Sequence, residues 1–303
     1  MHIGWQSLDG MQKVRDRVRM TQPGRLPTAP NVWQRQLGMR LRELREQTGL
    51  SADQVADQMG CSQAKVTRIE NARTKVDKPD LWMMLDIYGV TDKGPFWALA
   101  QAGRQSSWWA AYRDVIDQSL VEYMSFEQAA REARVWSLAT VHGLLQTEDY
   151  ARATFAGGWP GPAEQIDRVV SARMKRQKRL EDGTLTLWAI LDETILYRPV
   201  GGPQVLRGQL DHLLRLPAAV TVQVVPTANS WHPGLSSAFT LMDFAEYPTV
   251  GYIEASFRDT YIESADSVRW YTLLFDQLRA AGANPQDSRG MIEAARDKIP
   301  GSN

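Results

Sequence analysis

The sequence predicts an α+β protein, in which an all-α domain of five short helices precedes a larger, mostly helical domain with a small mixed β-sheet. Apolar residues recur at helical spacing through the first third of the chain. Strand-like apolar runs appear only after residue 183, and helical patterns lie between and after them. The length of 303 residues is about twice that of a usual domain, which favours two domains or one large one.

Residues 1–31 show no periodicity and contain several prolines, so we expect a flexible or partly helical basic arm. The all-α domain is expected over residues 32–103. Its first helix presents Trp33, Leu37, Leu41 and Leu44 on one face and ends at Gly49. Further helices are expected after the caps or prolines at Ser51, Ser62, Pro79 and Pro95.

The larger domain is expected over residues 104–303. An aromatic-rich helical stretch runs from Trp108 to about Ser137, with no strand before residue 184. Later helices are predicted over 147–155, 163–180, 201–216, 264–280 and 285–298. Strands are predicted over 184–192, 220–226, 238–244 and 249–254.

The formal charge of zero conceals an uneven distribution. Residues 1–78 hold fourteen Lys and Arg against eight Asp and Glu, a net charge of +6. Residues 79–303 hold twenty-one against twenty-seven, a net charge of −6. A basic front joined to an acidic body hints at nucleic-acid contact by the front, although a solvated charged surface explains the same counts.

Several classes of protein are disfavoured by composition. The single cysteine, Cys61, excludes an internal disulfide framework and a cysteine-based zinc site. No apolar stretch reaches the roughly 20 residues of a membrane crossing, and the first twenty residues lack the apolar region of a secretory signal. We therefore expect a cytoplasmic protein without cofactor or metal.

We expect no enzyme activity, because the acidic and histidine residues of the body match no catalytic or metal-binding spacing. These candidates are Asp192, Glu193, His142, His212, His232, Glu254 and Glu263. Aromatic residues of the body fit either a ligand pocket or the core. They are Trp108, Trp109, Tyr112, Trp136, Trp159 and Trp188.

Residues 50–71 carry the main functional signal, because two short helices joined by a turn with Gly60 form a helix-turn-helix pattern. An ordinary helical hairpin is the alternative. The solvent side of the second helix carries side chains suited to base edges: Gln for adenine, Arg for guanine, and Ala or Thr for a thymine methyl. These are Gln63, Ala64, Thr67 and Arg68. Cations that follow the helix, Arg73 and Lys75, suit phosphates.

The same region resembles the XRE (Cro/repressor-type) helix-turn-helix family. The similarity rests on Leu37–Arg45, Thr48–Ser51, Val55-Ala56, Met59–Ser62 and Val66–Asn71. It implies base readout by Gln63, Ala64, Thr67 and Arg68, and phosphate contacts by Ser62, Lys65, Asn71 and Arg73. It also implies that Arg45 and Glu70 tie the first helix to the recognition helix. Ala72 replaces the glycine usual in that family, which leaves open whether this turn is rebuilt.

The body resembles a recurrent actinobacterial companion domain of unassigned function. The similarity rests on Ser107–Trp109, Tyr112–Asp114, Gly143–Arg152, Leu191–Glu193, Arg198–Gly202, Val222–Pro226 and His232–Gly234. Members of that family are associated with developmental and antibiotic-production control, and genes for small proteins often lie next to theirs. The resemblance implies a protein partner but supplies no ligand and no catalytic residue.

Two functions follow as hypotheses. The first is a transcriptional regulator that binds a double-stranded operator as a homodimer, with half-sites about 34 Å apart, and whose body senses a small molecule or a small partner protein. The second is an antitoxin-like protein whose body neutralises a small partner and whose DNA binding serves autoregulation. An obligate stoichiometric partner would favour the second.

Overall fold

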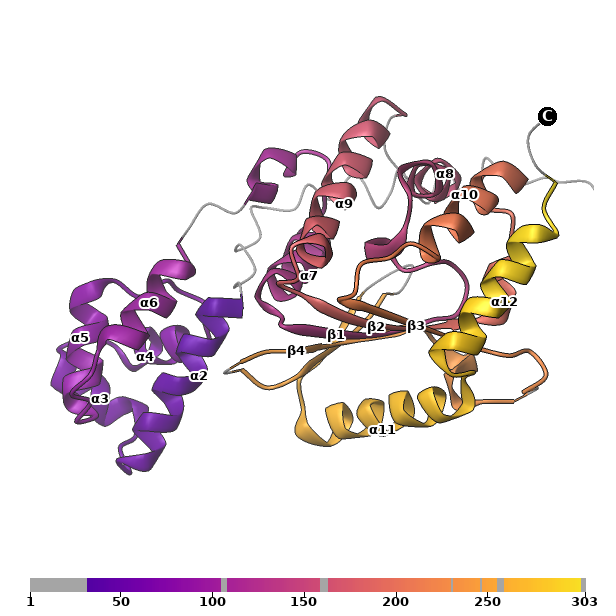
Figure 1. The fold of residues 1–303 in the computed structure, drawn as a ribbon. Coiled ribbons are helices and arrows are strands. Elements are labelled where there is room, and N and C mark those ends of the chain that lie inside the picture. The colour runs from indigo at the N-terminus through magenta and orange to yellow at the C-terminus, as the bar shows by residue number, and fades with distance from the viewer. Residues whose placement is uncertain are drawn as a thin grey trace, which may run out of the picture.

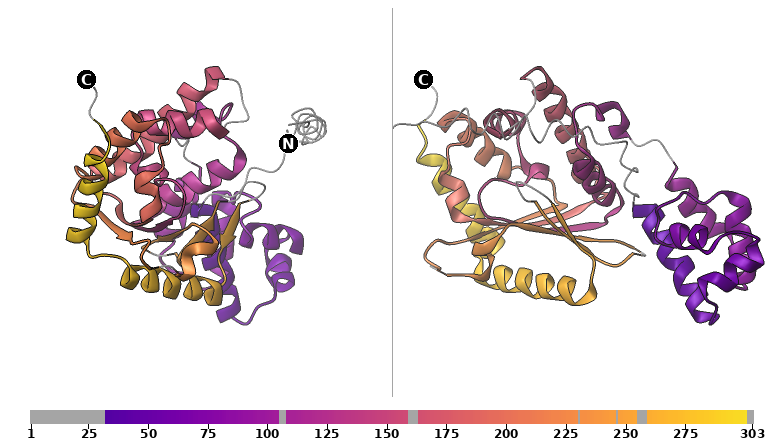
Figure 2. Two further views of the ribbon diagram at one scale, coloured as in Figure 1. Left: turned by 90° about the vertical axis from the view of Figure 1, so that its right-hand side faces the viewer. Right: turned by 180° about the vertical axis from the view of Figure 1, so that it is seen from behind.

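The computed structural model describes residues 32–104, 108–158, 163–229, 231–245, 247–254 and 259–300. The expected arm over residues 1–31 and the candidate Trp159 lie outside them. Two lobes stand side by side, and Figures 1 and 2 show the N-terminal helices beside a body built around one sheet. None of the described helices is both long enough and apolar enough to pass through a membrane.

The N-terminal lobe contains the five short helices that the spacing predicted. Leu41, Val55, Val66 and Leu85 meet in its core, each from a different helix. The helices are α2 (Val32–Gln47), α3 (Ala52–Met59), α4 (Gln63–Glu70), α5 (Lys78–Ile87) and α6 (Gly94–Ala102).

The body contains a six-stranded mixed sheet in the order β3-β2-β1-β4-β5-β6, which confirms the α+β class. Its strands are β1 (Glu132–Ser137), β2 (Thr186–Asp192), β3 (Val220–Val225), β4 (Phe239–Asp243), β5 (Val250–Ile253) and β6 (Thr260–Ile262). The first three strands are parallel, and β4 runs antiparallel to β1. Val135 therefore lies opposite Ala189 on one side and Thr240 on the other.

Helices cover both faces of the sheet (Figure 1). The body helices are α7 (Gln118–Ala129), α8 (Glu148–Gly158), α9 (Ile166–Glu181), α10 (Pro203–Leu213), α11 (Ala265–Ala281) and α12 (Pro285–Asp297). Short 3-10 turns lie at Trp108–Tyr112, Gly143–Leu145, Ala163–Gln165, Glu193–Tyr197 and Pro233–Ser236. On one face Phe275 and Leu278 of α11 pack against Trp136 and Leu241. The larger core fills the opposite face.

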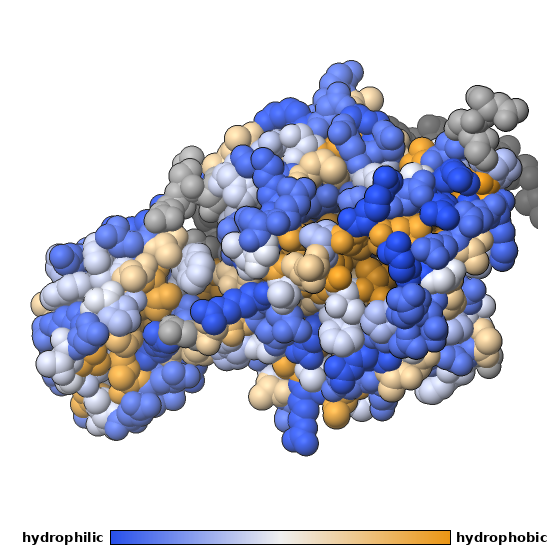
Figure 3. Space-filling model, viewed as in Figure 1, coloured by the Kyte–Doolittle hydropathy of each residue, from blue (hydrophilic) through white to orange (hydrophobic). Residues whose placement is uncertain are grey.

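On the surface that Figure 3 shows, hydrophobic residues of the body gather in a hollow edged by hydrophilic ones.

The expected helical stretch from Trp108 to Ser137 is wrong over its last residues, and before α7 only the 3-10 turn Trp108–Tyr112 is helical. The helix α7 ends at Ala129, and residues 132–137 form β1, the strand that β2 and β4 flank. Ala133 and Val135 point into the larger core and Trp136 toward α11, which is the alternation of a strand. The strand is only six residues long, so hydrogen bonds on both sides decide its conformation rather than local periodicity.

Candidate nucleic-acid interface

The turn between α3 and α4 has the geometry that a helix-turn-helix requires. Ser51 begins α3 with a complete capping box, in which its hydroxyl accepts from Gln54 N–H and the Gln54 side chain accepts from Ser51 N–H. Gly60 ends α3 in the left-handed conformation, with φ of 62°. The chain therefore turns sharply and enters α4 only three residues later.

The helix α4 divides cleanly into a buried side and a solvent side. Val66 and Ile69 are buried in the core of the lobe. Gln63, Ala64 and Arg68 are exposed, and Thr67 is half-buried beside them. The four candidate base-reading residues therefore share the outer side of one eight-residue helix.

A buried ion pair holds α4 against α2. Arg45 Nε donates to Glu70 Oε1 at 2.7 Å, and Arg45 Nη2 donates to Glu70 Oε2 at 3.0 Å. Arg45 Nη1 also donates to the carbonyl of Leu50 at 3.0 Å. The hydrogen bond with Glu70 raises the pKa of Arg45. This confirms the tie between the first and recognition helices, and it fixes α4 by a bidentate contact.

The turn after α4 keeps its left-handed residue although that residue is alanine. Ala72 is buried and has φ of 57°, and its N–H donates to the carbonyl of Ile69 at 2.9 Å. The turn is therefore not rebuilt. An alanine in this conformation costs roughly 1–2 kcal/mol, which the surrounding packing of the lobe offsets.

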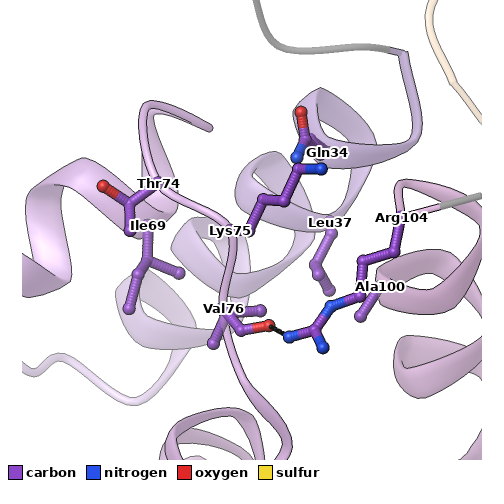
Figure 4. A pocket seen from close by; sticks show the side chains of 8 residues that line it. All are labelled: Gln34, Leu37, Ile69, Thr74, Lys75, Val76, Ala100 and Arg104. Carbon is purple, nitrogen blue, oxygen red and sulfur yellow. Dashed lines mark hydrogen bonds between the residues drawn. The ribbon is translucent and has the colours of Figure 1, made fainter. Parts of the chain in front are cut away.

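The segment that follows this turn lines a small crevice and is held in place there by Arg104 and by the buried side chain of Val76 (Figure 4). Arg104 Nη2 donates to the carbonyl of Val76 at 2.6 Å, and the Val76 side chain is buried. The lining residues are Gln34, Leu37, Ile69, Thr74, Lys75, Val76, Ala100 and Arg104. The segment between α4 and α5 is thus held to α2 and α6, while Arg73 and Lys75 remain exposed.

The cations near α4 differ in their partners. Within the described part of the chain, Arg68, Arg73 and Lys75 have no ion-pair partner. Lys65 is half-buried, and its Nζ lies 2.6 Å from Asp80 Oδ2. The hydrogen bond with Asp80 raises the pKa of Lys65. Ser62 begins α4 without a side-chain cap bond, and Asn71 is exposed at its end.

The carboxylates proposed as catalytic candidates have structural partners. Asp192 accepts from Thr194 N–H at 2.9 Å and lies 3.5 Å from His232 Nε2 in a buried contact. Glu193 accepts from Thr227 N–H at 2.7 Å. Each carboxylate therefore stabilises the start of a turn or loop.

The remaining candidates are scattered over the body. Glu263 pairs with Arg35 of α2, and His212 is a half-buried residue of α10. His142 and Glu254 line a cavity beside β1. Among the described residues no group of three or more His, Cys, Asp or Glu side chains is placed to hold a metal ion.

The aromatic candidates divide between two clusters. Trp108, Trp109 and Tyr112 pack with one another, and Trp109 joins Val169 of α9 in a small core. Trp136 and Trp188 pack on the α11 side of the sheet. Packing therefore accounts for four of these residues, while Trp136 both packs in the core and lines the cavity beside β1.

Sequence reasoning missed three residues that position the interface. Gly38 of α2 lies so close to α4 that an added Cβ would stand 2.3 Å from the carbonyl oxygen of Glu70. Arg104 holds the segment after α4 through its hydrogen bond to Val76, and Asp80 forms an ion pair with Lys65. A glycine within the first helix was the only signal visible in the sequence, since the other two depend on tertiary placement.

Comparison with family models gives two matches. Residues 36–93 match a family described as a helix-turn-helix domain, which indicates a DNA-binding regulator and points away from an enzyme. Residues 120–294, more than half of the chain, match a family described as a domain of unknown function (DUF5753). Comparison with curated proteins and with solved structures found no match.

Proposed function

The chain belongs to the DUF5753 family and carries a helix-turn-helix domain at its N-terminal side, and from this premise we propose that it is a sequence-specific transcriptional regulator. The observation that carries the proposal is the outer side of α4. Side chains able to read bases are exposed there, while the opposite side is locked into the core. A recognition helix needs this combination, because base readout requires side chains held in fixed register.

We propose that Gln63 and Arg68 read an adenine and a guanine, and that Ala64 and Thr67 meet thymine methyl groups. Gln63 and Ala64 belong to the first turn of α4, which is the part that enters the major groove most deeply in this motif. Arg68 lies one turn further on. Its lack of a protein ion-pair partner within the described residues leaves the guanidinium available for a base.

We propose phosphate contacts for residues at both ends of α4. Arg73 and Lys75 are exposed cations on an anchored segment, which supports this role most directly. Ser62 and Asn71 flank the helix as exposed hydrogen-bonding side chains. Lys65 would first have to leave Asp80, so its contribution should be smaller.

We further propose that the protein acts as a homodimer. On α11, Trp270 and Leu273 are three positions apart and keep 65% and 52% of their surface exposed. Large apolar side chains exposed together support association between copies. Dimeric binding would place two copies of α4 in successive major grooves, about 34 Å apart.

The acidic body is the proposed receiver of a signal, either a small molecule or a small partner protein. The antitoxin-like alternative gives the body the partner as its main target. Mass analysis of the purified full chain separates the two: a small protein retained in stoichiometric amount favours the alternative, and its absence together with tight DNA binding favours the regulator.

Selection from a pool of random DNA duplexes tests the proposed function. The full chain should enrich one recurring motif, arranged as an inverted repeat with half-site centres about 10 base pairs apart. The variant Arg152→Ala, changed at a solvent-accessible cation of α8 away from both α4 and α11, should enrich the same motif. A bound pool without any recurring motif would overturn sequence-specific binding, and a single unrepeated half-site would overturn the dimer.

A further inference from the structure

A cavity of about 340 Å³ lies at the carboxyl end of β1 in the body. Its main polar and aromatic lining comes from Tyr123, Ser137, His142, Arg173, Thr240 and Tyr252. The chain runs from β1 through β2 to β3 on one side and then returns to place β4 on the other side of β1, so the strand order reverses here. Crevices at such points are where open α/β sheets bind ligands, and the volume suits a small molecule.

Arg173 brings a positive charge to this cavity, and no carboxylate of the described residues forms an ion pair with it. Its Nη1 donates to Gln146 Oε1 at 2.6 Å, and its guanidinium lies 4.1 Å from the centre of the Phe155 ring. Its Nε is buried without a hydrogen-bond partner. Burial lowers the pKa of Arg173 to about 10, so the group stays protonated at neutral pH. A buried cation without a counter-ion is unfavourable, and a bound anion would relieve it.

The neighbouring charged groups compensate Arg173 only in part. Arg176, one helical turn along α9, is neutralised by Glu127 through bonds of 2.8 and 2.6 Å. Glu254 is the only carboxylate that lines the cavity within the described chain. Its charge favours the protonated form of Arg173, but it is exposed and makes no ion pair with Arg173. Arg173 is therefore a buried cation of the cavity wall that has no direct counter-ion among the described residues.

The rest of the lining is neutral and rich in hydrogen-bonding groups. His142 Nδ1 accepts from Leu144 N–H at 3.3 Å, which leaves the ring hydrogen on Nε2, 3.3 Å from Tyr123 Oη. Burial lowers the pKa of His142 to about 3, so the ring is neutral. The hydroxyls of Ser137 and Thr240 belong to the lining, and the Tyr123 and Tyr252 rings pack with centres 4.5 Å apart.

We propose that this cavity binds a small hydroxylated organic anion, whose carboxylate or phosphate group pairs with Arg173 and whose hydroxyls meet the neutral polar lining. A guanidinium edge recognises either acidic group through paired hydrogen bonds. The tyrosine rings form the apolar wall that a carbon skeleton of sugar size requires.

The helix α7 connects the cavity with the DNA-binding lobe. Leu120 and Tyr123 of α7 line the cavity. From the same helix, Glu122 pairs with Arg35 of α2, and Ser125 Oγ accepts from Val32 N–H at 3.0 Å. A ligand that shifts α7 would therefore act on the first turn of α2. This coupling rests on the proposed function, whereas ligand binding itself does not.

Calorimetry with the full chain and two matched pairs of probes tests the site. The anions are ribose 5-phosphate and gluconate, and their neutral counterparts are ribose and glucose. At least one anion should bind at least about tenfold more tightly than its counterpart. Arg173→Met should remove that binding, while Arg168→Met on the same helix, at an exposed ion pair with Asp114, should not.

Three results would overturn the site: no binding of either anion up to about 10 mM, equal binding of an anion and its neutral counterpart, or unchanged binding by Arg173→Met. Folding of Arg173→Met is checked by its melting temperature, which should equal or exceed that of the wild type because an uncompensated cation is removed. A change of DNA affinity on adding the bound anion tests the coupling separately. Failure to bind DNA would contradict the proposed function and leave the calorimetric result standing.

Discussion

The cations around α4 differ in whether a carboxylate of the protein already pairs with them, and this decides how readily each can contact DNA. Lys75 is exposed and lies on a segment that the Arg104–Val76 hydrogen bond fastens. Lys65, by contrast, already has Asp80 as a counter-ion. Two lysines ten positions apart should therefore differ in their effect on DNA affinity, although the sequence alone made them equivalent.

For Lys75→Ala we expect weaker binding to all DNA sequences alike, because a phosphate contact carries no base information. The slope of log affinity against log salt concentration should fall by about one unit. Fluorescence anisotropy between low and moderate salt measures this slope, and Lys65→Ala serves as the matched variant with a smaller change. An unchanged slope would remove Lys75 from the interface.

The buried pair of Arg176 and Glu127 should contribute to folding more than any exposed pair of the body. Both side chains are almost fully buried. Glu127→Ala leaves the guanidinium without its counter-ion, so the free energy of unfolding should fall by about 3–5 kcal/mol. Urea unfolding followed by circular dichroism measures the loss. Glu148→Ala, at an exposed pair with Arg152, should lower it far less, because solvent screens an exposed ion pair. Similar losses in both variants would contradict the argument.

At the residue level, the ion pair that could be predicted was one that a family resemblance implied. The pair of Arg45 and Glu70 was expected from a family resemblance and is present with both hydrogen bonds. The state of Arg173 was not foreseen, because its missing counter-ion depends on which side chains of α7, α8 and α9 meet. Tertiary placement of charges leaves no periodic signal in a sequence.

Among the elements, α2 and α4 are held together by close backbone contact at Gly38. A methyl group there would meet the Glu70 carbonyl oxygen at 2.3 Å. Gly38→Ala should therefore separate the two helices and destabilise the lobe by roughly 1–3 kcal/mol. Hydrogen exchange of α2 and α4 amides in the full chain reports this locally.

The matched variant is Gly290→Ala in α12, where an added methyl meets no atom within 4 Å. Alanine should stabilise that helix by about 0.5–1 kcal/mol, because glycine is a poor helix former. We expect faster amide exchange in α2 and α4 of the Gly38→Ala variant and no such change in the Gly290→Ala variant. Equal behaviour of the two variants would show that the close contact is unimportant.

The helices had strong local signals and were predictable, whereas two of the six strands were not. The helices of residues 32–102 followed from apolar spacing and caps such as Ser51 and Gly60. The strand β1 was missed because no glycine or proline separates it from the end of α7, so the expected helical stretch ran through it. The strand β6 was missed because it has only three residues. The central position of β1 shows that a strand important to the fold need not be conspicuous in sequence.

For the molecule as a whole, the division of charge does not coincide with the division of structure. The basic portion, residues 1–78, contains α2 to α4, whereas most of α5, all of α6 and the whole sheet lie in the acidic remainder. The domain boundary at residue 103 stays a prediction. Val32 packs in the core of the body, and Arg35 pairs with Glu122 and Glu263. The first turn of α2 thus joins the two lobes, which supplies a physical route for communication between them.

The central claim is that the outer side of α4 reads base sequence, and the variant Arg68→Ala tests it most directly. Affinity is measured for the operator that the wild type selects and for a scrambled duplex of the same composition. We expect a loss of about 1–3 kcal/mol on the operator and little change on the scrambled duplex, so that discrimination falls at one base position. An equal loss on both duplexes, or none on either, would contradict base readout by α4.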